Sequence, residues 1–242
     1  MSSESKAAGT ARLVSLGDEE AVKEVLAATV LDLWKVVNNL TRLRPSKRER
    51  YRVAIFGSAR ASPGTFVYDE VKRLAAAFAA MGCDIVTGGG PGLMQAANEG
   101  ARDAGAPGSM GIGIELPFEQ GVNPFVEQAF EHQTFFTRLQ HFVIASDVFV
   151  VVPGGIGTVL EMMMIWQLLQ VRKLHDTPLI LAGKMYAELV DWCKRYMLRP
   201  DCPLASPEDM TIPVCVEDGP SILRAIRARH AAWKAAARGA NA

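Results

Sequence analysis

The sequence is poor in the residues that would mark a secreted or zinc-binding protein. It has only four cysteines, Cys83, Cys193, Cys202 and Cys215, which are far apart and form no CxxC pair. This spacing favours reduced thiols over a disulfide framework or a zinc site. The four histidines also lack zinc-ligand spacing and are His132, His141, His175 and His230. We therefore expect no metal site.

The sequence also has no excess charge of either sign and no long apolar run. Lys and Arg together number 26, as do Asp and Glu, so global charge gives no support for a nucleic-acid partner. No apolar run reaches membrane-spanning length, and the polar start lacks a secretory hydrophobic region. These absences predict a soluble, cytoplasmic protein that contacts neither membrane nor nucleic acid.

Several well-known catalytic and cofactor motifs are missing. Leu160 occupies the position at which a dinucleotide-binding fingerprint would have its third glycine. The sequence around Gly183-Lys184 does not match the P-loop motif. There is no GxSxG elbow, so a serine nucleophile has no support. Lys184 is the only lysine just after an expected strand, but nothing around it indicates a pyridoxal pocket. We expect no organic cofactor.

What is present is an alternation of short apolar strands and amphipathic helices from Arg52 onward. Strands are expected at residues 53–56, 83–87, 111–116, 148–152, 178–182 and 212–216. Residues 117–130 are expected to form a loop, and helices to fill most of the remaining intervals. This order predicts an α/β fold: a Rossmann-like, doubly wound, mostly parallel sheet with helices on both faces.

The first 50 residues precede this pattern. Residues 1–17 are small and polar, which predicts disorder, and Asp18 is expected to cap an appended helix that runs to about Leu40. The basic stretch at residues 42–50 is typical of a solvated linker, with a nucleotide or nucleic-acid contact as the alternative. We therefore divide the chain into residues 1–50 and a single nucleotide-binding domain at residues 51–242.

The most informative stretch is VVVPGGIGTVLE at residues 150–161. A buried strand breaks at Pro153 and a helix follows from about Thr158, so unpaired amides and the positive helix end form an anion site, typically for phosphate. Thr158 adds a hydroxyl, and Glu161 places a carboxylate one turn further along. The alternative is an ordinary strand-to-helix turn with a glutamate that faces the core.

Two more glycine turns follow strands, at Gly57-Ser58 and at residues 88–92. Ligands of open α/β sheets bind beyond the carboxyl ends of the strands, so all three turns should line one pocket. Arg138, among apolar neighbours on the helix before the central strand, is the candidate cation. A surface arginine is the alternative.

These residues together resemble the Lonely-guy phosphoribohydrolases, long labelled lysine decarboxylase-like. Residues 153–161 match the family's PGGxGTxxE signature, and TGGGPGLMQAAN at residues 87–98 looks like its first glycine motif. Arg138 stands where the family has its catalytic arginine. The sequence ELPFEQ at residues 115–120 and the long first helix look more like the longer bacterial branch. Leu139 and Phe142 replace the family's usual lysine and methionine, which puts the substrate range in doubt.

The resemblance implies hydrolysis of a nucleoside 5′-monophosphate, either cytokinin riboside monophosphate or AMP, to free base and ribose 5-phosphate. It makes Arg138 and Glu161 catalytic. Substrate would contact Ser58, Gly88, Gly89, Gly90, Met94, Gly154, Gly155, Ile156, Gly157 and Thr158. The alternative function is a non-catalytic carrier of a nucleotide or of the molybdenum cofactor, since such carriers have a similar fold.

The helix that contains the signature is apolar on nearly every face over residues 162–169. Part of it should therefore be covered by protein outside its own sheet. We expect a homodimer or an assembly of dimers, with the first helix of the same chain as the alternative cover.

Overall fold

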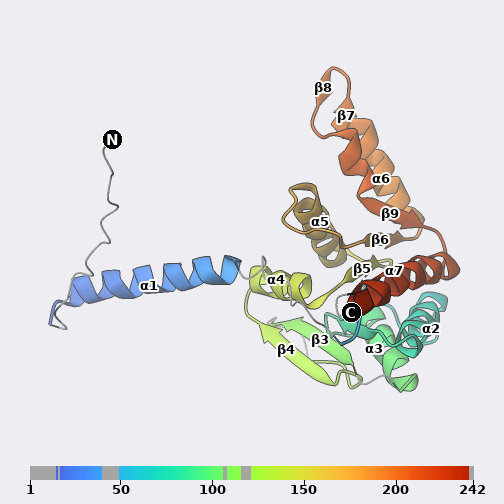
Figure 1. Ribbon diagram of the computed structural model, residues 1–242, viewed down its shortest axis with the longest axis horizontal. Helices are drawn as coiled ribbons and strands as arrows, with labels where there is room; N and C mark the ends of the chain where they lie inside the picture. The colour runs from blue at the N-terminus through green and yellow to red at the C-terminus, as the bar shows by residue number, and fades with distance from the viewer. Residues whose placement is uncertain (1–14, 16, 40–48, 106–107, 116–120, 240–242) are drawn as a thin grey trace. The chain divides into compact units, whose positions relative to one another are not determined.

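The computed structural model describes residue 15 and residues 17–39, 49–105, 108–115 and 121–239. The chain divides into two compact units, Met1–Leu43 and Arg44–Ala242. The first contains one long helix and the second contains the whole sheet (Figure 1).

The second unit is built on a seven-stranded parallel sheet of order β4-β3-β2-β1-β5-β6-β9. Its strands are β1 Arg52–Phe56, β2 Asp84–Thr87, β3 Ser109–Ile114, β4 Gln128–His132, β5 Val148–Val151, β6 Leu179–Ala182 and β9 Pro213–Val216. The chain extends the sheet from β1 toward β4 and then returns to place β5 on the other side of β1. The strand order therefore reverses between β1 and β5, which is where ligands of such sheets bind.

Six helices cover the two faces of this sheet. They are α2 Phe66–Ala80, α3 Leu93–Asp103, α4 Phe135–Ala145, α5 Ile156–Gln170, α6 Lys184–Met197 and α7 Gly219–Gly239. Residues of α2, α3 and α7 share one apolar core, and residues of α4, α5 and α6 share the other (Figure 1).

The alternation of side chains along each central strand builds these two cores. In β1, Val53 and Ile55 join the core under α2 and α3, whereas Ala54 and Phe56 join the core under α4 and α5. Because consecutive strand residues point to opposite faces, a strand between two helix layers must be apolar throughout. This explains the β-branched runs and confirms the expected Rossmann-like α/β fold with helices on both faces.

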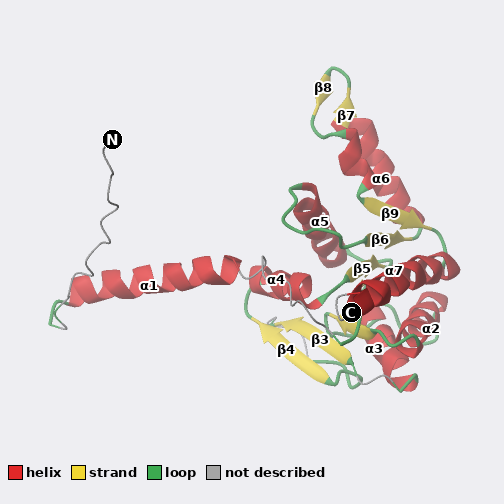
Figure 2. Ribbon diagram, viewed as in Figure 1, coloured by secondary structure: helices red, strands yellow, loops and turns green. Residues whose placement is uncertain are grey.

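The prediction of a loop at residues 117–130 is wrong at its C-terminal end, because Gln128–His132 forms strand β4. Its side chains are mostly exposed, and β4 pairs with β3 alone at the sheet edge. An exposed edge strand does not need a run of apolar residues, so the sequence QAFEH at residues 128–132 lacks the apolar run that predicts a buried strand. The short antiparallel pair β7 Leu198–Arg199 and β8 Cys202–Pro203, which follows α6, was also not expected (Figure 2).

The first unit contains helix α1, Glu19–Asn39. Asp18 caps it as expected, since its Oδ1 accepts a hydrogen bond from the amide of Ala21 at 3.2 Å. The exposed residues of α1 include several apolar ones, Val25, Leu26, Val30 and Leu31. Most of the expected disordered start, and residues 42–48 of the basic stretch, lie outside the described residues.

The four cysteines are free thiols. Within the described residues, no three His, Cys, Asp or Glu side chains are grouped so that they could hold a metal ion. No helix in this part of the chain is long and apolar enough to cross a membrane.

Candidate active site

The three glycine turns meet at the carboxyl edge of the central strands. The Ser58 amide, just after β1, donates to the carbonyl of Pro153 after β5 at 3.1 Å. The Ser58 carbonyl accepts from the amide of Leu93, the first residue of α3, at 2.8 Å. A Cβ on Gly92 would overlap the oxygen of that carbonyl, so only glycine allows the approach. The turn at Gly57-Ser58 is thus hydrogen-bonded both to Pro153 of the third turn and to Leu93, directly after the second turn.

Helix α5 begins at Ile156, two residues earlier than expected, so Ile156, Gly157 and Thr158 all lie in its first turn. Gly155 is the N-cap and provides no side-chain hydrogen bond to the helix amides. A side chain on Gly155 or Gly157 would meet open space, so the backbone is accessible there. The first amides of a helix have no partner within it, which makes this accessible end suited to an anion.

Thr158 contacts the turn that precedes its own helix. A Cβ on Gly154 would overlap the Thr158 Oγ1, so this turn closes tightly only because residue 154 is glycine. Thr158 is buried, and its hydroxyl lies against the Gly154 backbone. Ile156 lies at the start of the same helix with its side chain exposed, so of this residue only the backbone could serve the site.

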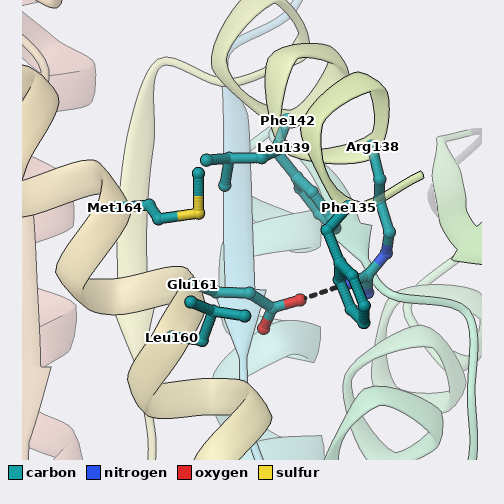
Figure 3. A pocket seen from close by; sticks show the side chains of 7 residues that line it. All are labelled: Phe135, Arg138, Leu139, Phe142, Leu160, Glu161 and Met164. Atoms are coloured by element: carbon teal, nitrogen blue, oxygen red, sulfur yellow. Dashed lines mark hydrogen bonds and ion pairs between the residues drawn. The ribbon is translucent and has the colours of Figure 1, made fainter.

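Arg138 and Glu161 form the polar centre of the site. The Arg138 Nη1 lies 2.5 Å from the Glu161 Oε1, and the Arg138 and Glu161 side chains are 11% and 16% exposed. Figure 3 shows the two groups pointing toward one another, Arg138 from α4 and Glu161 from α5. The two residues are 23 positions apart in the sequence, and the fold joins a cation and a carboxylate that the sequence only suggested separately.

Arg138 is held by the sheet as well as by Glu161. Its Nε donates to the carbonyl of Ile112 in β3 at 2.8 Å. A Cβ on Gly88 would lie 2.5 Å from the Arg138 Nη2 and 2.6 Å from the Met94 sulfur. The guanidinium therefore lies over the second glycine turn, which cannot carry a side chain at Gly88 without displacing it. Gly90 lies against the Met94 methyl group, whereas Gly89 is buried against Gly111 in β3.

The Glu161 side chain is mostly buried, and burial disfavours an ionised carboxylate. Burial raises the pKa of its carboxyl above the ordinary value, and the adjacent Arg138 guanidinium opposes that rise. Tyr186 of α6 is fully buried, donates to the Val152 carbonyl at 3.0 Å and has its pKa raised to about 12, first by burial and then by the charge of Glu161. A buried carboxylate with a shifted pKa and a specific charge partner, beside a pocket, is a candidate functional group.

A small pocket opens between α4 and α5 beside this ion pair (Figure 3). Its other lining side chains are apolar and are Phe135, Leu139, Phe142, Leu160 and Met164. The empty space is about 230 Å³ with open solvent included. Leu139 and Phe142, the two departures from the family pattern, make this wall apolar.

A buried polar network behind the glycine turn was not anticipated. The Asn123 Nδ2 donates to the carbonyls of Gly89 and Gly90 at 3.0 and 2.9 Å, and to the Asn98 Oδ1 at 3.1 Å. Asn98 also accepts from the Thr87 hydroxyl and donates to the Ser109 hydroxyl. The signal for Asn98 was its place among alanines on the buried face of α3. Asn123 lies in a loop, where an asparagine gives no such signal.

Comparison with known proteins agrees with this architecture. The family model described as "Possible lysine decarboxylase" matches residues 94–226, more than half of the chain. That range includes Arg138 and Glu161 but not the turn at residues 88–92. No curated protein matches the sequence.

Two solved structures illustrate the shared fold. The molybdenum cofactor carrier protein MCP from Chlamydomonas reinhardtii aligns with a TM-score of 0.53 and 18% identity, over 74% of this chain and 97% of that one. The molybdenum cofactor binding protein from Rippkaea orientalis aligns with a TM-score of 0.56 and 20% identity, over 75% of this chain and 98% of that one. At these identities the likeness is one of fold.

Proposed function

This chain belongs to the family described as possible lysine decarboxylase, and we propose that within it the protein acts as a phosphoribohydrolase. It would hydrolyse the N-glycosidic bond of a nucleoside 5′-monophosphate, AMP or a cytokinin riboside monophosphate, to free base and ribose 5-phosphate. The observation that carries the proposal is the buried Arg138–Glu161 pair, one helical turn beyond an accessible helix N-terminus.

Each part of the site has a role in this reaction. The amides of residues 155–158, with the Thr158 hydroxyl, would bind the 5′-phosphate at the positive end of α5. This places the ribose near Glu161, whose carboxylate would stabilise the positive charge that develops on the sugar, or orient the attacking water. Arg138 would keep that carboxylate ionised and fix the substrate or assist the departing base. Ser58, Gly88 and Met94 would border the ribose and the base.

The size of the pocket supports an extended substrate position. The pocket between α4 and α5 is small and opens to solvent beside the Arg138–Glu161 pair, so the ligand would lie mainly across the glycine turns. The exposed apolar lining residues Phe135 and Leu160 would then meet one end of the substrate, above the buried Leu139 and Phe142. A base would contact apolar side chains there, in place of the family's usual lysine.

Lysine decarboxylation, despite the family's description, is not the activity we propose. Among the described residues, Lys184 is the only lysine directly after a sheet strand, and its side chain is 87% exposed beside Glu188. A Schiff-base lysine is instead desolvated within its cofactor pocket. The alternative is a carrier of a nucleotide or of the molybdenum cofactor, as the similar folds suggest. Binding alone does not need a buried carboxylate near a phosphate, which favours hydrolysis.

The test is base release from AMP and from adenosine at equal concentration. Adenosine leaves the α5 amides facing only water, and the absence of each charge-assisted hydrogen bond costs about 1.5–3 kcal/mol. We expect kcat/KM for AMP to exceed that for adenosine by several orders of magnitude, partly in kcat because bound phosphate holds the ribose at Glu161.

Thr158→Val is the matched variant for this experiment. It keeps the size of the buried side chain and removes only the hydroxyl, so it should slow AMP cleavage about tenfold to hundredfold. Cleavage of adenosine should change little, because adenosine has no phosphate for this hydroxyl to bind. Equal cleavage of the two substrates, or equal slowing of both by the variant, would refute the phosphate-binding role. Tight binding without any base release would favour the carrier.

A further inference from the structure

Two histidines lie beside the proposed active site and have no part in the mechanism above. His132 ends the edge strand β4, and its Nε2 lies 3.0 Å from the Nδ1 of His141 on α4. The Phe130 ring packs edge-on against His141, with centroids 4.6 Å apart. Only one proton fits between two ring nitrogens at 3.0 Å, so one imidazole donates and the other accepts.

The charges around this pair favour its neutral form. Burial, followed by the charge of Arg138, lowers the pKa of His132. Burial likewise lowers the pKa of His141, followed by the charges of His132 and of Arg52. Because burial and neighbouring cations both disfavour the charged form, both rings are neutral near pH 7 and the N–H···N bond is intact.

The pair is placed to hold Arg138. His141 is three residues after Arg138 on α4, which makes the two positions neighbours on the helix surface, and the charge of Arg138 also acts on His132. That helix packs on β3 and β4, and its first turn exposes Phe135 and Phe136 to solvent. The contacts that hold this end of α4 in place therefore include Leu139 and Phe142 beneath it and the histidine bond to β4.

We propose that His132 and His141 are positioning residues: their hydrogen bond ties α4 to the edge strand and so holds the Arg138 guanidinium between Gly88 and Glu161. The effect on turnover rests on the proposed function, whereas the effect on Arg138 does not. Arg138 accommodates three neighbours at once, the Ile112 carbonyl, Glu161 and the Gly88 backbone. A displacement of α4 would lengthen the hydrogen bonds of Arg138 to the Ile112 carbonyl and to Glu161, which are now 2.8 and 2.5 Å long.

The test compares variants that keep the bond with variants that remove it. His141→Asn retains a polar group near the Nδ1 position, and His132→Gln retains one near the Nε2 position. His141→Leu and His132→Leu keep the bulk and remove the bond. Phe130→Leu is the control, because it removes the ring contact with His141 and leaves the histidine pair in place. Thermal unfolding of each variant checks that it folds.

The first readout is the Arg138 Nε–H signal in a proton–nitrogen NMR spectrum, assigned by its disappearance in Arg138→Lys. We expect this signal to shift and broaden in both leucine variants and to stay near its wild-type position in His141→Asn and Phe130→Leu. The second readout is AMP hydrolysis. Removal of one neutral hydrogen bond corresponds to about a twofold to tenfold effect, expected in kcat more than in KM, with recovery in His141→Asn.

An unchanged Arg138 signal in His141→Leu would overturn the proposal. So would a His141→Asn variant as impaired as His141→Leu, since ring packing would then be what matters. If the wild-type protein releases no base from any nucleoside monophosphate, the proposed function fails, and the NMR comparison alone decides the positioning role.

Discussion

Glu161 shows how one residue type acquires a reactive state from its surroundings. Its side chain is mostly buried, which raises the carboxyl pKa, and one guanidinium at 2.5 Å opposes that rise. The ion pair with Arg138 engages Oε1, and in the proposed hydrolysis Oε2 would face the sugar or a water. The carboxylate is therefore oriented by Arg138 and still has an oxygen for the reaction, as the proposed hydrolysis requires.

Replacement of Glu161 by glutamine should abolish turnover and leave the fold intact. Glutamine keeps the size and a hydrogen bond to Arg138 but removes the negative charge that opposes a cationic transition state. Removal of such a group costs about 2.7–4 kcal/mol, or roughly a hundredfold to a thousandfold in kcat. The measurement is base release from AMP, with thermal unfolding as the fold control. A near-normal rate would remove Glu161 from the mechanism.

Asn123 should contribute to both stability and activity, because it fixes the glycine turn under Arg138. Its side-chain amide supplies buried hydrogen bonds to the carbonyls of Gly89 and Gly90. Asn123→Ala removes the side-chain donor to the Gly90 carbonyl, whereas the Gly89 carbonyl still accepts from the backbone amide of residue 123 at 2.7 Å. We expect a cost of about 1–3 kcal/mol in the free energy of unfolding by urea. We also expect slower AMP hydrolysis, since Gly88 would no longer be held against the guanidinium.

Asn123→Asp is the matched variant. It keeps the oxygen that accepts from the Phe125 amide, removes the donor and adds a buried charge, so it should be at least as damaging as alanine. An alanine variant within about 0.5 kcal/mol of the wild type in urea would contradict the role of this network.

At the scale of elements, helix α7 packs on the core through a buried histidine, His230. Its Ile222 and Ile226 enter the core shared with α2 and α3, and His230 continues that face one turn later. The His230 ring packs near Tyr51 and Trp233, with centroid distances of 5.5 and 5.9 Å. Among the described residues its Nε2 is buried without a hydrogen-bond partner. Helix α7 is thus anchored by a histidine that must stay neutral.

The stability of the protein should fall with acid through His230. Burial, followed by the charge of Lys234, lowers the pKa of this histidine in the folded state. The unfolded chain then binds the proton more tightly, so the contribution to stability is present above about pH 6.5 and is lost as the pH falls through the folded-state pKa. We expect the wild-type Tm to drop on acidification and His230→Phe to show a smaller drop.

If His230→Phe loses stability with acid as steeply as the wild type, the effect belongs to other groups.

At the scale of the whole molecule, apolar surface gathers around the site on α4 and α5. Helix α5 is apolar along its length but exposes Leu160 by 43% and Met163 by 37%, and Val171 at its end by half. On α4, Phe136 is 70% exposed and Phe135 is half exposed. Several exposed large apolar side chains on two helices beside one pocket are typical of an interface.

We therefore predict that the protein forms a homodimer or an assembly of dimers through α4 and α5. Static light scattering at micromolar concentration should give at least twice the mass of the 26.2 kDa chain. Phe136→Asp would place a charge in the interface and should shift the mass toward the monomer. A wild-type monomer would contradict the prediction.

The sequence by itself determined the order of the buried strands and of the helices between them, and the chemistry at their ends. Runs such as the β-branched residues before Pro153 must form buried parallel strands, because only strands covered on both faces are apolar throughout. Glycines directly after such strands indicate turns that a side chain would block, as at Gly92 and Gly154. These are local rules of covalent geometry and burial, and they were enough to predict the α/β fold and to nominate the residues of the candidate site.

Tertiary structure alone decided which distant residues became partners. Edge strand β4 is polar and exposed, so no periodic pattern predicts it, and it pairs only because β3 offers it a free edge. The Asn98–Asn123 network, the His132–His141 pair and the Arg138–Glu161 ion pair each join residues from different elements. Such contacts depend on how strands are ordered and helices packed, and a hydrogen bond needs its two atoms placed to within a few tenths of an ångström. Spacing along the chain contains no information at that resolution.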